Sequence, residues 1–269
     1  MSHAAAFEDD RPPRALTAAA SARWRPAFVA DWAEATFVHF AVEPRRLQPF
    51  VPFELDLHEG RAYVSLVAFT MRHMRPARLD SPAGELLLRA IMPCRFLNVR
   101  TYVRAGGGDG IYFLGEWLSQ WMNIPFGPAL YGLPYRPGHL CFARDPETRS
   151  VDVDVRGLRG GRLTFRSRSD AAAPLTAAAP RSCDAFLLER YFAFTMRRGR
   201  PLVFEVEHAP WAQTAADISM DETSLLSATG DWISHARLVG AHFTPGALGV
   251  RMGAPKALRR APGRSAFLG

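Results

Sequence analysis

The sequence predicts a mainly β protein, a β-rich α+β fold in which a large antiparallel sheet carries a few short helices. Three observations predict this class: several segments alternate apolar and polar residues with a period of two, glycine-rich turns join them into hairpins, and the helical patterns are short. The chain has 269 residues, enough to bury one large core without disulfide bonds. We expect a single domain over residues 26–248.

The first hairpin is predicted near the middle of the chain. Residues 97–104 place Leu97 and Val99 on one face of a strand and Asn98 and Arg100 on the other. The turn GGGDG follows and leads into the apolar segment IYFL, which completes the hairpin. The turn lacks the Lys-Ser/Thr pair and the helix that follow a phosphate-binding loop.

The second hairpin has an alternating first strand, VDVDVR, and a returning strand, RLTFRSR. Asp152 and Asp154 are expected to face Arg166 and Arg168 across the hairpin. Such cross-strand pairs contribute about 0.2–1 kcal/mol each. Some of the arginines are therefore expected to belong to the sheet surface rather than to a binding site.

Two more strands are predicted at residues 63–71 and 202–208. In the second, Leu202, Phe204 and Val206 share an apolar face that ends at His208. His208 is expected either at the mouth of a pocket or, in the simpler interpretation, as a partly buried histidine with its hydrogen bonds satisfied.

The helical patterns are short, and one low-complexity segment, residues 169–181, is expected to be an exposed loop. Helices are predicted at residues 44–51, 86–91, 116–123 and 184–192.

The charge of the chain is concentrated at its C-terminal end. The 33 basic and 26 acidic residues give +7, and the only lysine is Lys256. Residues 249–269 carry five basic residues and no acid, and we expect them to form a basic tail, while residues 1–25 form a flexible tail. Because the remaining body is nearly neutral, nucleic-acid binding is disfavoured, except weakly through the basic tail.

Location and cofactor use are predicted from what the sequence lacks. It has no apolar run of 18 residues, no secretory signal pattern at its start, and three well-separated cysteines, so we expect a cytoplasmic protein that makes no membrane contact. The histidines and cysteines lack metal-site spacing, and no nucleotide or hydrolase motif is present. We therefore expect no metal and no cofactor.

An ordered set of motifs resembles the YqjF-like family of uncharacterised bacterial proteins, a domain-of-unknown-function family, over roughly residues 30–255. That family is similar to the acetoacetate-decarboxylase-like superfamily. The resemblance implies a large antiparallel barrel with a few short peripheral helices and an internal small-molecule pocket. The motifs are WAEATFVHFAVEPRRLQPFVPFELDLHEGRAYVSLV, FLNVRTYV, LYGLPY, FLLERY and HAPW.

The resemblance also implies a difference in chemistry. In the decarboxylases a Gly-x-Pro-Lys-Lys segment supplies the lysine that forms a Schiff base. The matching segment here is GLPYR, so Tyr135 and Arg136 stand where the two lysines would be. Neither can form an imine, and Lys256 lies far along the chain. We therefore expect no Schiff-base decarboxylation.

Seven residues are candidates for the pocket. Tyr135 is a candidate proton donor and Glu116 a candidate general base, with packing and a helix first turn as the simpler interpretations. If Arg100 points into a barrel, its guanidinium would bind a carboxylate through two hydrogen bonds; if it points outward, it would be a surface residue. The candidate ligand-binding residues are Arg100, Arg136, Tyr131, His208 and Trp211.

The sequence thus predicts a protein that binds a small anionic or carbonyl-bearing ligand. If the protein is an enzyme, acid–base chemistry on a carbonyl compound or organic acid is expected. A non-catalytic ligand-binding or regulatory module on the same fold is the first alternative, and weak nucleic-acid binding through the basic tail is the second.

Overall fold

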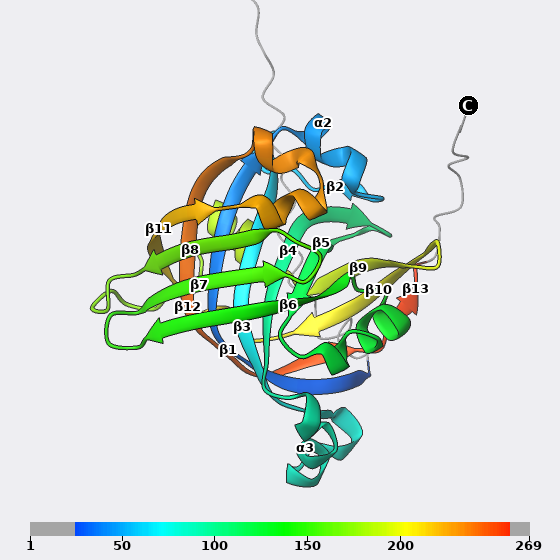
Figure 1. Ribbon diagram of the computed structural model, residues 1–269. Coiled ribbons are helices and arrows are strands. Elements are labelled where there is room, and N and C mark those ends of the chain that lie inside the picture. Colours follow the sequence, from blue (N-terminus) through cyan, green and yellow to red (C-terminus); the bar gives the residue numbers. More distant parts are fainter. Residues whose placement is uncertain (1–24, 259–269) are drawn as a thin grey trace, which may run out of the picture.

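The computed structural model describes residues 25–258, and its strands form one continuous, strongly curved sheet of 13 strands (Figure 1). Almost all neighbouring strands are antiparallel; the pairings of β5 with β6 and β9 are parallel. The strands are β1 (Pro26–Val42), β2 (Glu54–Leu55), β3 (Ala62–Pro76), β4 (Cys94–Ala105), β5 (Gly108–Leu118), β6 (Tyr135–Asp145), β7 (Ser150–Gly157), β8 (Arg162–Arg168), β9 (Phe192–Arg197), β10 (Arg200–Glu207), β11 (Thr214–Glu222), β12 (Arg237–Gly253) and β13 (Lys256–Ala257).

The sheet closes on itself in two rings that share one wall. The larger ring is a barrel of nine strands: β5, β6, β7, β8, β11, β12, β1, β3 and β4. The smaller ring is closed by β9 and β10, which join β5 to β12 on the other side of the same wall. The shared wall therefore consists of β12, β1, β3, β4 and β5 (Figure 1).

The shared wall is buried on both of its faces. Ten consecutive residues of β3, from Ala62 to Met71, are buried, and so are most residues of β1 and β4. Alternate side chains of these strands enter two separate hydrophobic clusters. The first cluster lies inside the larger ring, and the second cluster faces β9 and β10. The face of β4 that looked polar in the sequence, with Asn98 and Arg100, is consequently interior as well.

The predicted hairpins are confirmed. β4 pairs with β5 and β7 pairs with β8 in antiparallel register. Asp152 faces Arg166 across the second hairpin as expected, whereas Asp154 is bound by Arg156 and Arg162. Residues 169–181 form an irregular segment between β8 and α4, in which Thr176 makes an isolated bridge to Gln213.

Three of the four predicted helices are present, with shifted boundaries. The first is α2 (Pro44–Leu47) followed by η1 (Gln48–Phe50), the second is α3 (Pro82–Leu88) with η3 (Arg89–Ile91), and the third is α4 (Cys183–Leu188). The other short helical segments are η2 (Ala77–Leu79), η4 (Trp121–Asn123), η5 (Gly127–Tyr131), η6 (Ser224–Thr229) and η7 (Asp231–His235).

The helix predicted at residues 116–123 is wrong except at its end, where η4 covers residues 121–123. Glu116, Trp117 and Leu118 end strand β5, where they pair with β4 on one side and β6 on the other. Pairing on both sides overrides the weak local preference for helix. Glu116 therefore does not lie in the first turn of a helix, and that simpler interpretation of Glu116 is wrong.

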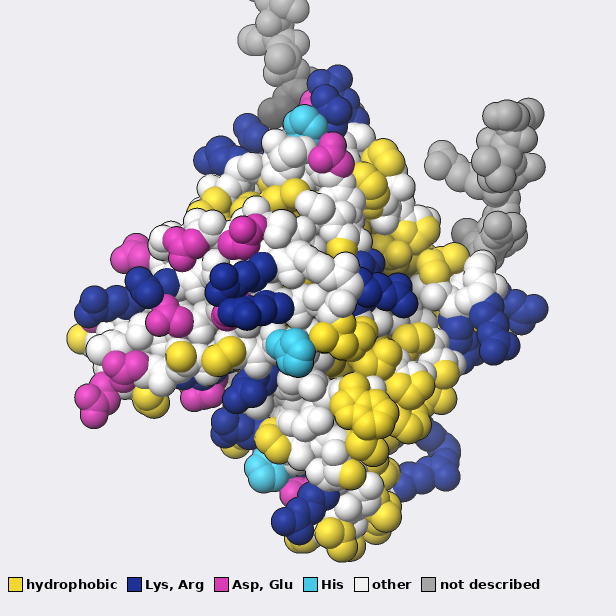
Figure 2. Space-filling view, viewed as in Figure 1, with side chains coloured by type: hydrophobic (Ala, Val, Ile, Leu, Met, Phe, Trp, Pro, Cys, Tyr) yellow, Lys and Arg dark blue, Asp and Glu magenta, His cyan; other side chains and the backbone are white. Residues whose placement is uncertain are grey.

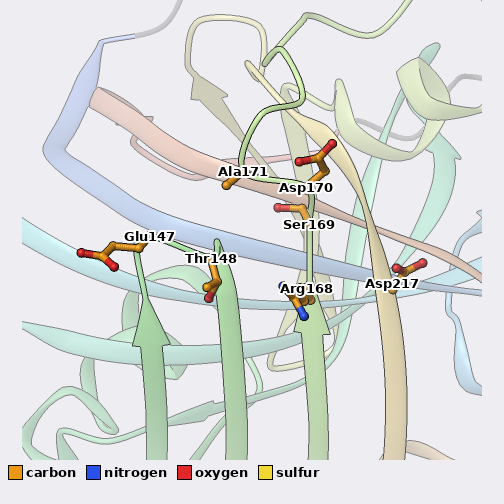
Figure 3. Close-up of a pocket in the computed structure, with 7 residues that line it drawn as sticks. All are labelled: Glu147, Thr148, Arg168, Ser169, Asp170, Ala171 and Asp217. Atoms are coloured by element: carbon orange, nitrogen blue, oxygen red, sulfur yellow. The ribbon is translucent and has the colours of Figure 1, made fainter.

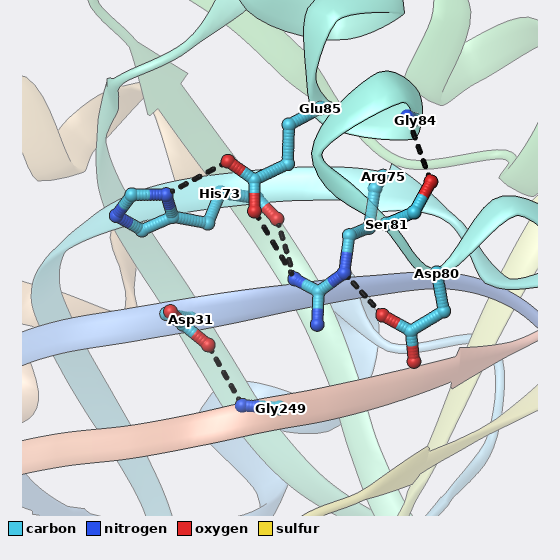
Figure 4. A network of polar contacts seen from close by, with 8 residues as sticks. All are labelled: Asp31, His73, Arg75, Asp80, Ser81, Gly84, Glu85 and Gly249. Carbon is cyan, nitrogen blue, oxygen red and sulfur yellow. Dashed lines mark hydrogen bonds and ion pairs between the residues drawn. The ribbon is translucent and has the colours of Figure 1, made fainter.

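Helix α3 is held to β3 by a polar network (Figure 4). The Ser81 hydroxyl accepts a hydrogen bond from the Gly84 amide at 3.4 Å and caps the helix. His73 and Arg75 of β3 both reach the carboxylate of Glu85, and Arg75 also binds Asp80. α3 thus lies at one end of the wall, away from the two cores (Figure 1).

The C-terminal boundary differs from the prediction. β12 continues to Gly253, and β13 pairs Lys256 with Val203 of β10, so residues 249–253 and 256–257 belong to the sheet and not to a tail. Pairing with β1 and β10 provides the hydrogen bonds that this stretch needs. Residues 1–24 and 259–269, the remainder of the two predicted tails, lie outside the described residues. Between residues 25 and 258, no helix has the length and apolar character needed to cross a bilayer.

Candidate functional site

Three polar side chains lie in one row across the shared wall and its extension into β6. Asn98 of β4 is the register partner of Glu116 of β5, and Glu116 is in turn the partner of Tyr135 of β6. Asn98 and Glu116 are buried, and Tyr135 packs against the second cluster, with its ring 6.0 Å from that of Phe96. The row therefore lines the interior of the smaller ring.

Burial favours the neutral forms of the two titratable groups in this row. Desolvation raises the pKa of Glu116 well above its ordinary value and thereby favours the protonated carboxyl group. Burial, and next the proximity of Glu116, also raise the pKa of Tyr135 well above its ordinary value. A protonated carboxyl group and a phenol both donate hydrogen bonds, which suits them to a carbonyl oxygen.

Tyr131 adds a second phenol hydroxyl to the same interior. It ends the π-helical turn η5, and its ring meets Phe204 of β10 edge-on at 4.9 Å. Burial raises the pKa of Tyr131 to about 12. Among residues 25–258, the Tyr131 hydroxyl, Asn98 Oδ1 and Glu116 Oε2 are buried without a hydrogen-bond partner.

Arg100 is the cation of this interior. It is only 6% exposed, and its guanidinium carbon lies 5.2 Å from the ring centre of Phe37. One nitrogen, Nη2, donates to the Leu187 carbonyl of α4 at 3.0 Å, while Nε has no partner among the described residues. Burial lowers the pKa of Arg100, which still leaves arginine protonated.

Trp211 and His208 close the side of the interior next to Arg100. Trp211 is 2% exposed, and its indole meets the Phe37 ring at 5.5 Å. His208 lies just beyond β10, makes a tilted ring contact with Trp211 at 4.7 Å and donates a hydrogen bond from Nδ1 to the Ala209 carbonyl. Burial lowers the pKa of His208. Its hydrogen bond agrees with the simpler interpretation of His208 as a satisfied, partly buried histidine.

Arg136 does not join the other six candidates. It follows Tyr135 in β6, so its side chain points to the opposite face, where its guanidinium lies 5.3 Å from the Trp117 ring in the first cluster. The alternation of side chains along a strand separates the two neighbours. The structure thus brings together Arg100, Glu116, Tyr131, Tyr135, His208 and Trp211 around the second cluster.

A chain of buried polar groups adjoins Arg100 that the sequence did not reveal. Its hydrogen bonds run from His242 Nδ1 to His39 Nε2 (3.0 Å), from His39 Nδ1 to Ser65 Oγ (2.7 Å), from Ser65 Oγ to Tyr102 Oη (2.6 Å), and from Tyr102 Oη to the Leu187 carbonyl (2.8 Å). At the outer end, His242 Nε2 lies 3.3 Å from Asp184 Oδ1. We call these five residues, Asp184, His242, His39, Ser65 and Tyr102, the histidine chain.

One part of the histidine chain had a sequence signal. Phe37, His39 and Ala41 alternate along β1, which places His39 on a buried face. His242 is 203 residues away, and only the pairing of β1 with β12 brings the two imidazoles together. Within the described residues, no group of three or more His, Cys, Asp or Glu side chains has an arrangement that would hold a metal ion.

Arg190 of the FLLERY motif is a structural residue. Its Nη1 binds Asp56 at 2.8 Å and Asp109 at 2.6 Å, and its guanidinium lies 4.2 Å from the Phe186 ring centre. The neighbouring Glu189 accepts hydrogen bonds from Tyr191 and from the Trp211 amide. Both carboxylate oxygens of Glu189 are therefore committed.

Two surface clefts lie elsewhere. The first, of about 550 Å³, opens where β7, β8 and β11 end and contains Arg168 among Glu147, Asp170 and Asp217 (Figure 3). Its excess of carboxylates is unfavourable for an anionic ligand. The second, of about 510 Å³, lies beside His139 and Cys141. None of the seven predicted residues lines either cleft.

The surface over β6, β7 and β8 mixes both signs of charge (Figure 2). Arg162 and Arg156 share Asp154, and Arg166 binds Asp152. On this face two aspartates thus pair with three arginines.

Comparisons with known proteins agree with the fold. The model of the DUF2071 family, described as an uncharacterized conserved protein, matches residues 29–246. The uncharacterized protein YqjF of Bacillus subtilis is 26% identical over 202 residues, which are 74% of this chain and 80% of that protein.

Solved structures show the same architecture. An acetoacetate decarboxylase-like enzyme from Sphingomonas wittichii has a TM-score of 0.62 at 17% identity and covers 91% of this chain and 98% of its own. The acetoacetate decarboxylase of Legionella pneumophila has a TM-score of 0.60 at 10% identity, with 88% of each chain covered. MppR, an enduracididine biosynthesis enzyme solved with a condensation product of pyruvate, has a TM-score of 0.60 at 16% identity and covers 92% and 97%.

Proposed function

Since the chain belongs to the DUF2071 family and has the acetoacetate-decarboxylase-like fold, we propose that the interior of its smaller ring binds a small organic acid that carries a carbonyl group. Arg100 would hold the carboxylate of this acid. The neutral donors Glu116, Tyr131 and Tyr135 would face its carbonyl oxygen.

The observation that carries the proposal is the state of Arg100. Buried cations are normally paired with a carboxylate, because desolvation of an unpaired charge is costly. Arg100 donates to a backbone carbonyl and lies against two aromatic rings, and the nearby Tyr102 hydroxyl and Glu189 carboxylate favour its charge, yet none of the ion pairs among residues 25–258 includes it. An anionic ligand would provide the missing partner through the unpartnered Nε.

The chemistry open to the site is acid–base chemistry. A protonated Glu116 beside Tyr135 can donate a proton or a hydrogen bond to a developing enolate, and after deprotonation Glu116 can act as a base. Imine formation has no suitable residue, since Tyr135 and Arg136 occupy the segment matched to the lysines and Lys256 is exposed in β13.

The structural relatives support the class of ligand. MppR has been solved with pyruvate and with a condensation product of pyruvate. Pyruvate combines a carboxylate and a carbonyl group, which are the two functions that the Arg100 and Glu116 ends of this interior complement.

Calorimetric titration with pyruvate and with acetoacetate tests the proposal. Wild-type protein should bind at least one of the two, and Arg100→Met should weaken that binding roughly 10- to 100-fold, the range for loss of a charged hydrogen bond. Arg136→Met is the matched control and should bind as the wild type does. Absence of binding to the wild type, or equal losses in the two variants, would contradict the proposal.

Proton exchange distinguishes an acid–base catalyst from a non-catalytic binding module on this fold. In D₂O, an acid–base catalyst should exchange the protons next to the carbonyl group of bound pyruvate, and Glu116→Gln should abolish the exchange while it leaves binding in place. Binding without exchange in the wild type would favour the binding module. The convergence of Glu116, Tyr131 and Tyr135 favours catalysis.

A further inference from the structure

The histidine chain has a fixed direction, which follows from its inner end. The Leu187 carbonyl can only accept, so Tyr102 uses its one hydroxyl hydrogen to donate there. Ser65 must then donate to Tyr102, and His39 must donate from Nδ1 to Ser65. His39 Nε2 is therefore bare and accepts from His242 Nδ1. Each donor is assigned by elimination along the chain.

This direction leaves one position where a proton can be added. With both imidazoles neutral, His242 Nε2 carries no hydrogen, yet it faces the carboxylate of Asp184 at 3.3 Å. A proton on Nε2 would turn His242 into an imidazolium and complete a charged hydrogen bond to Asp184. Asp184 is 49% exposed, so water can deliver that proton without opening the core.

Arg100 opposes a positive charge on this pair of histidines, and it acts most directly on His39. Its Nη2 donates to the same Leu187 carbonyl as Tyr102, so its charge sits at the inner end of the chain. Burial is the main cause that lowers the pKa of His39, and the charges of His242 and Arg100 lower it further. Burial also lowers the pKa of His242, while Asp184 raises it. The charged and titratable groups around the pair are thus Arg100 and Tyr102 from β4 and Asp184 from α4.

We propose that the histidine chain takes up one proton at His242 when an anion binds to Arg100, so that ligand binding and proton binding are coupled across the wall. The anion neutralises Arg100 and thereby removes the charge that disfavours an imidazolium. The proton passes from water to His242 Nε2 beside Asp184, and no covalent bond between heavy atoms changes. This inference rests on the proposed function, because it requires an anionic ligand at Arg100.

Titration calorimetry of pyruvate at one pH in buffers with different ionisation enthalpies measures the coupling. Pyruvate is fully ionised near pH 6.5, so any proton taken up belongs to the protein. Wild-type protein should take up a measurable fraction of a proton per bound pyruvate at this pH. His242→Gln keeps a polar side chain that cannot be charged, and its uptake should fall close to zero. Asp184→Asn should lower the uptake as well, because it removes the charge that stabilises the imidazolium.

His139→Gln is the control, since His139 is exposed on β6 and should leave the uptake unchanged. Pyruvate binding without proton uptake, or equal uptake in wild type and His242→Gln, would overturn the coupling and leave the proposed function standing. Failure of the wild type to bind pyruvate or acetoacetate would overturn the proposed function and the coupling together. Circular dichroism of each variant checks that it is folded. If His242→Gln does not fold, Asp184→Asn, at a half-exposed position, tests the coupling in its place.

Discussion

Glu116 lies directly opposite Tyr135 where β5 and β6 pair in parallel; burial raises the pKa of both groups, and the proximity of Glu116 raises the pKa of Tyr135 further. The pairing depends on the long segment between the two strands, which returns the chain to the end of β5. Two residues 19 positions apart in the sequence thereby become neighbours in a buried row.

The stability of the protein should depend on the charge of Glu116. Its pKa is raised in the folded protein, so above the unfolded value of about 4.5 the unfolded chain has lost a proton that the folded chain keeps. Glu116 therefore destabilises the fold increasingly as pH rises from that value toward its folded pKa. Glu116→Gln should gain stability relative to wild type between pH 5 and pH 8, by up to about 1.4 kcal/mol per pH unit. Denaturant unfolding at both pH values measures this gain, and a constant difference would contradict it.

Tyr135 should be sensitive to the space above its ring. A Cβ added at Gly127 would lie 2.2 Å from a ring carbon of Tyr135, which is far too close. Gly127→Ala should destabilise the protein by roughly 1–3 kcal/mol and displace the ring from Glu116. Gly108→Ala, where an added Cβ meets nothing within 4 Å, is the control. Thermal unfolding should show a loss for the first variant only.

Arg190 should contribute to stability rather than to ligand binding. Both Arg190 and Asp56 are 4% exposed at the side chain, so Arg190→Met leaves the buried Asp56 with the half-exposed Arg104 as its remaining partner and should destabilise the protein by about 1–3 kcal/mol. Arg166→Met breaks an exposed pair with Asp152 and should change stability by less than about 1 kcal/mol. Urea unfolding compares the two, and pyruvate binding to folded Arg190→Met should be retained.

The single lysine predicts the outcome of chemical trapping. Borohydride reduction in the presence of acetoacetate should leave no covalent adduct at residue 256, because Lys256 lies exposed on β13, away from the row around Glu116. Mass spectrometry of the digested protein detects such an adduct. An adduct at Lys256 that requires Arg100 would contradict the assignment of the site.

Local patterns in the sequence were sufficient for the hairpins and for the class of fold, because alternation and glycine turns act over a few residues. They were insufficient for Glu116, whose helix-like surroundings were overridden by pairing with two distant strands. They also could not show that the polar face of β4 is interior, since this depends on the second ring closed by β9 and β10.

At the candidate site, too, local sequence patterns predicted some of the arrangement and missed the contacts that depend on distant strands. Arg100, Tyr131, Tyr135 and Trp211 were predicted as pocket residues, and the structure places their side chains around the second cluster. Arg136 was predicted beside Tyr135, yet strand geometry turns it to the other face. The contact of His39 with His242 arises only from the register of β1 and β12.

The crystal structure of the protein soaked with pyruvate tests the central claim most directly. The account predicts the carboxylate of pyruvate within hydrogen-bonding distance of the Arg100 guanidinium, with its carbonyl oxygen toward Glu116 and the two tyrosines. Pyruvate bound only at the surface cleft around Arg168, with Arg100 still unpaired, would contradict it.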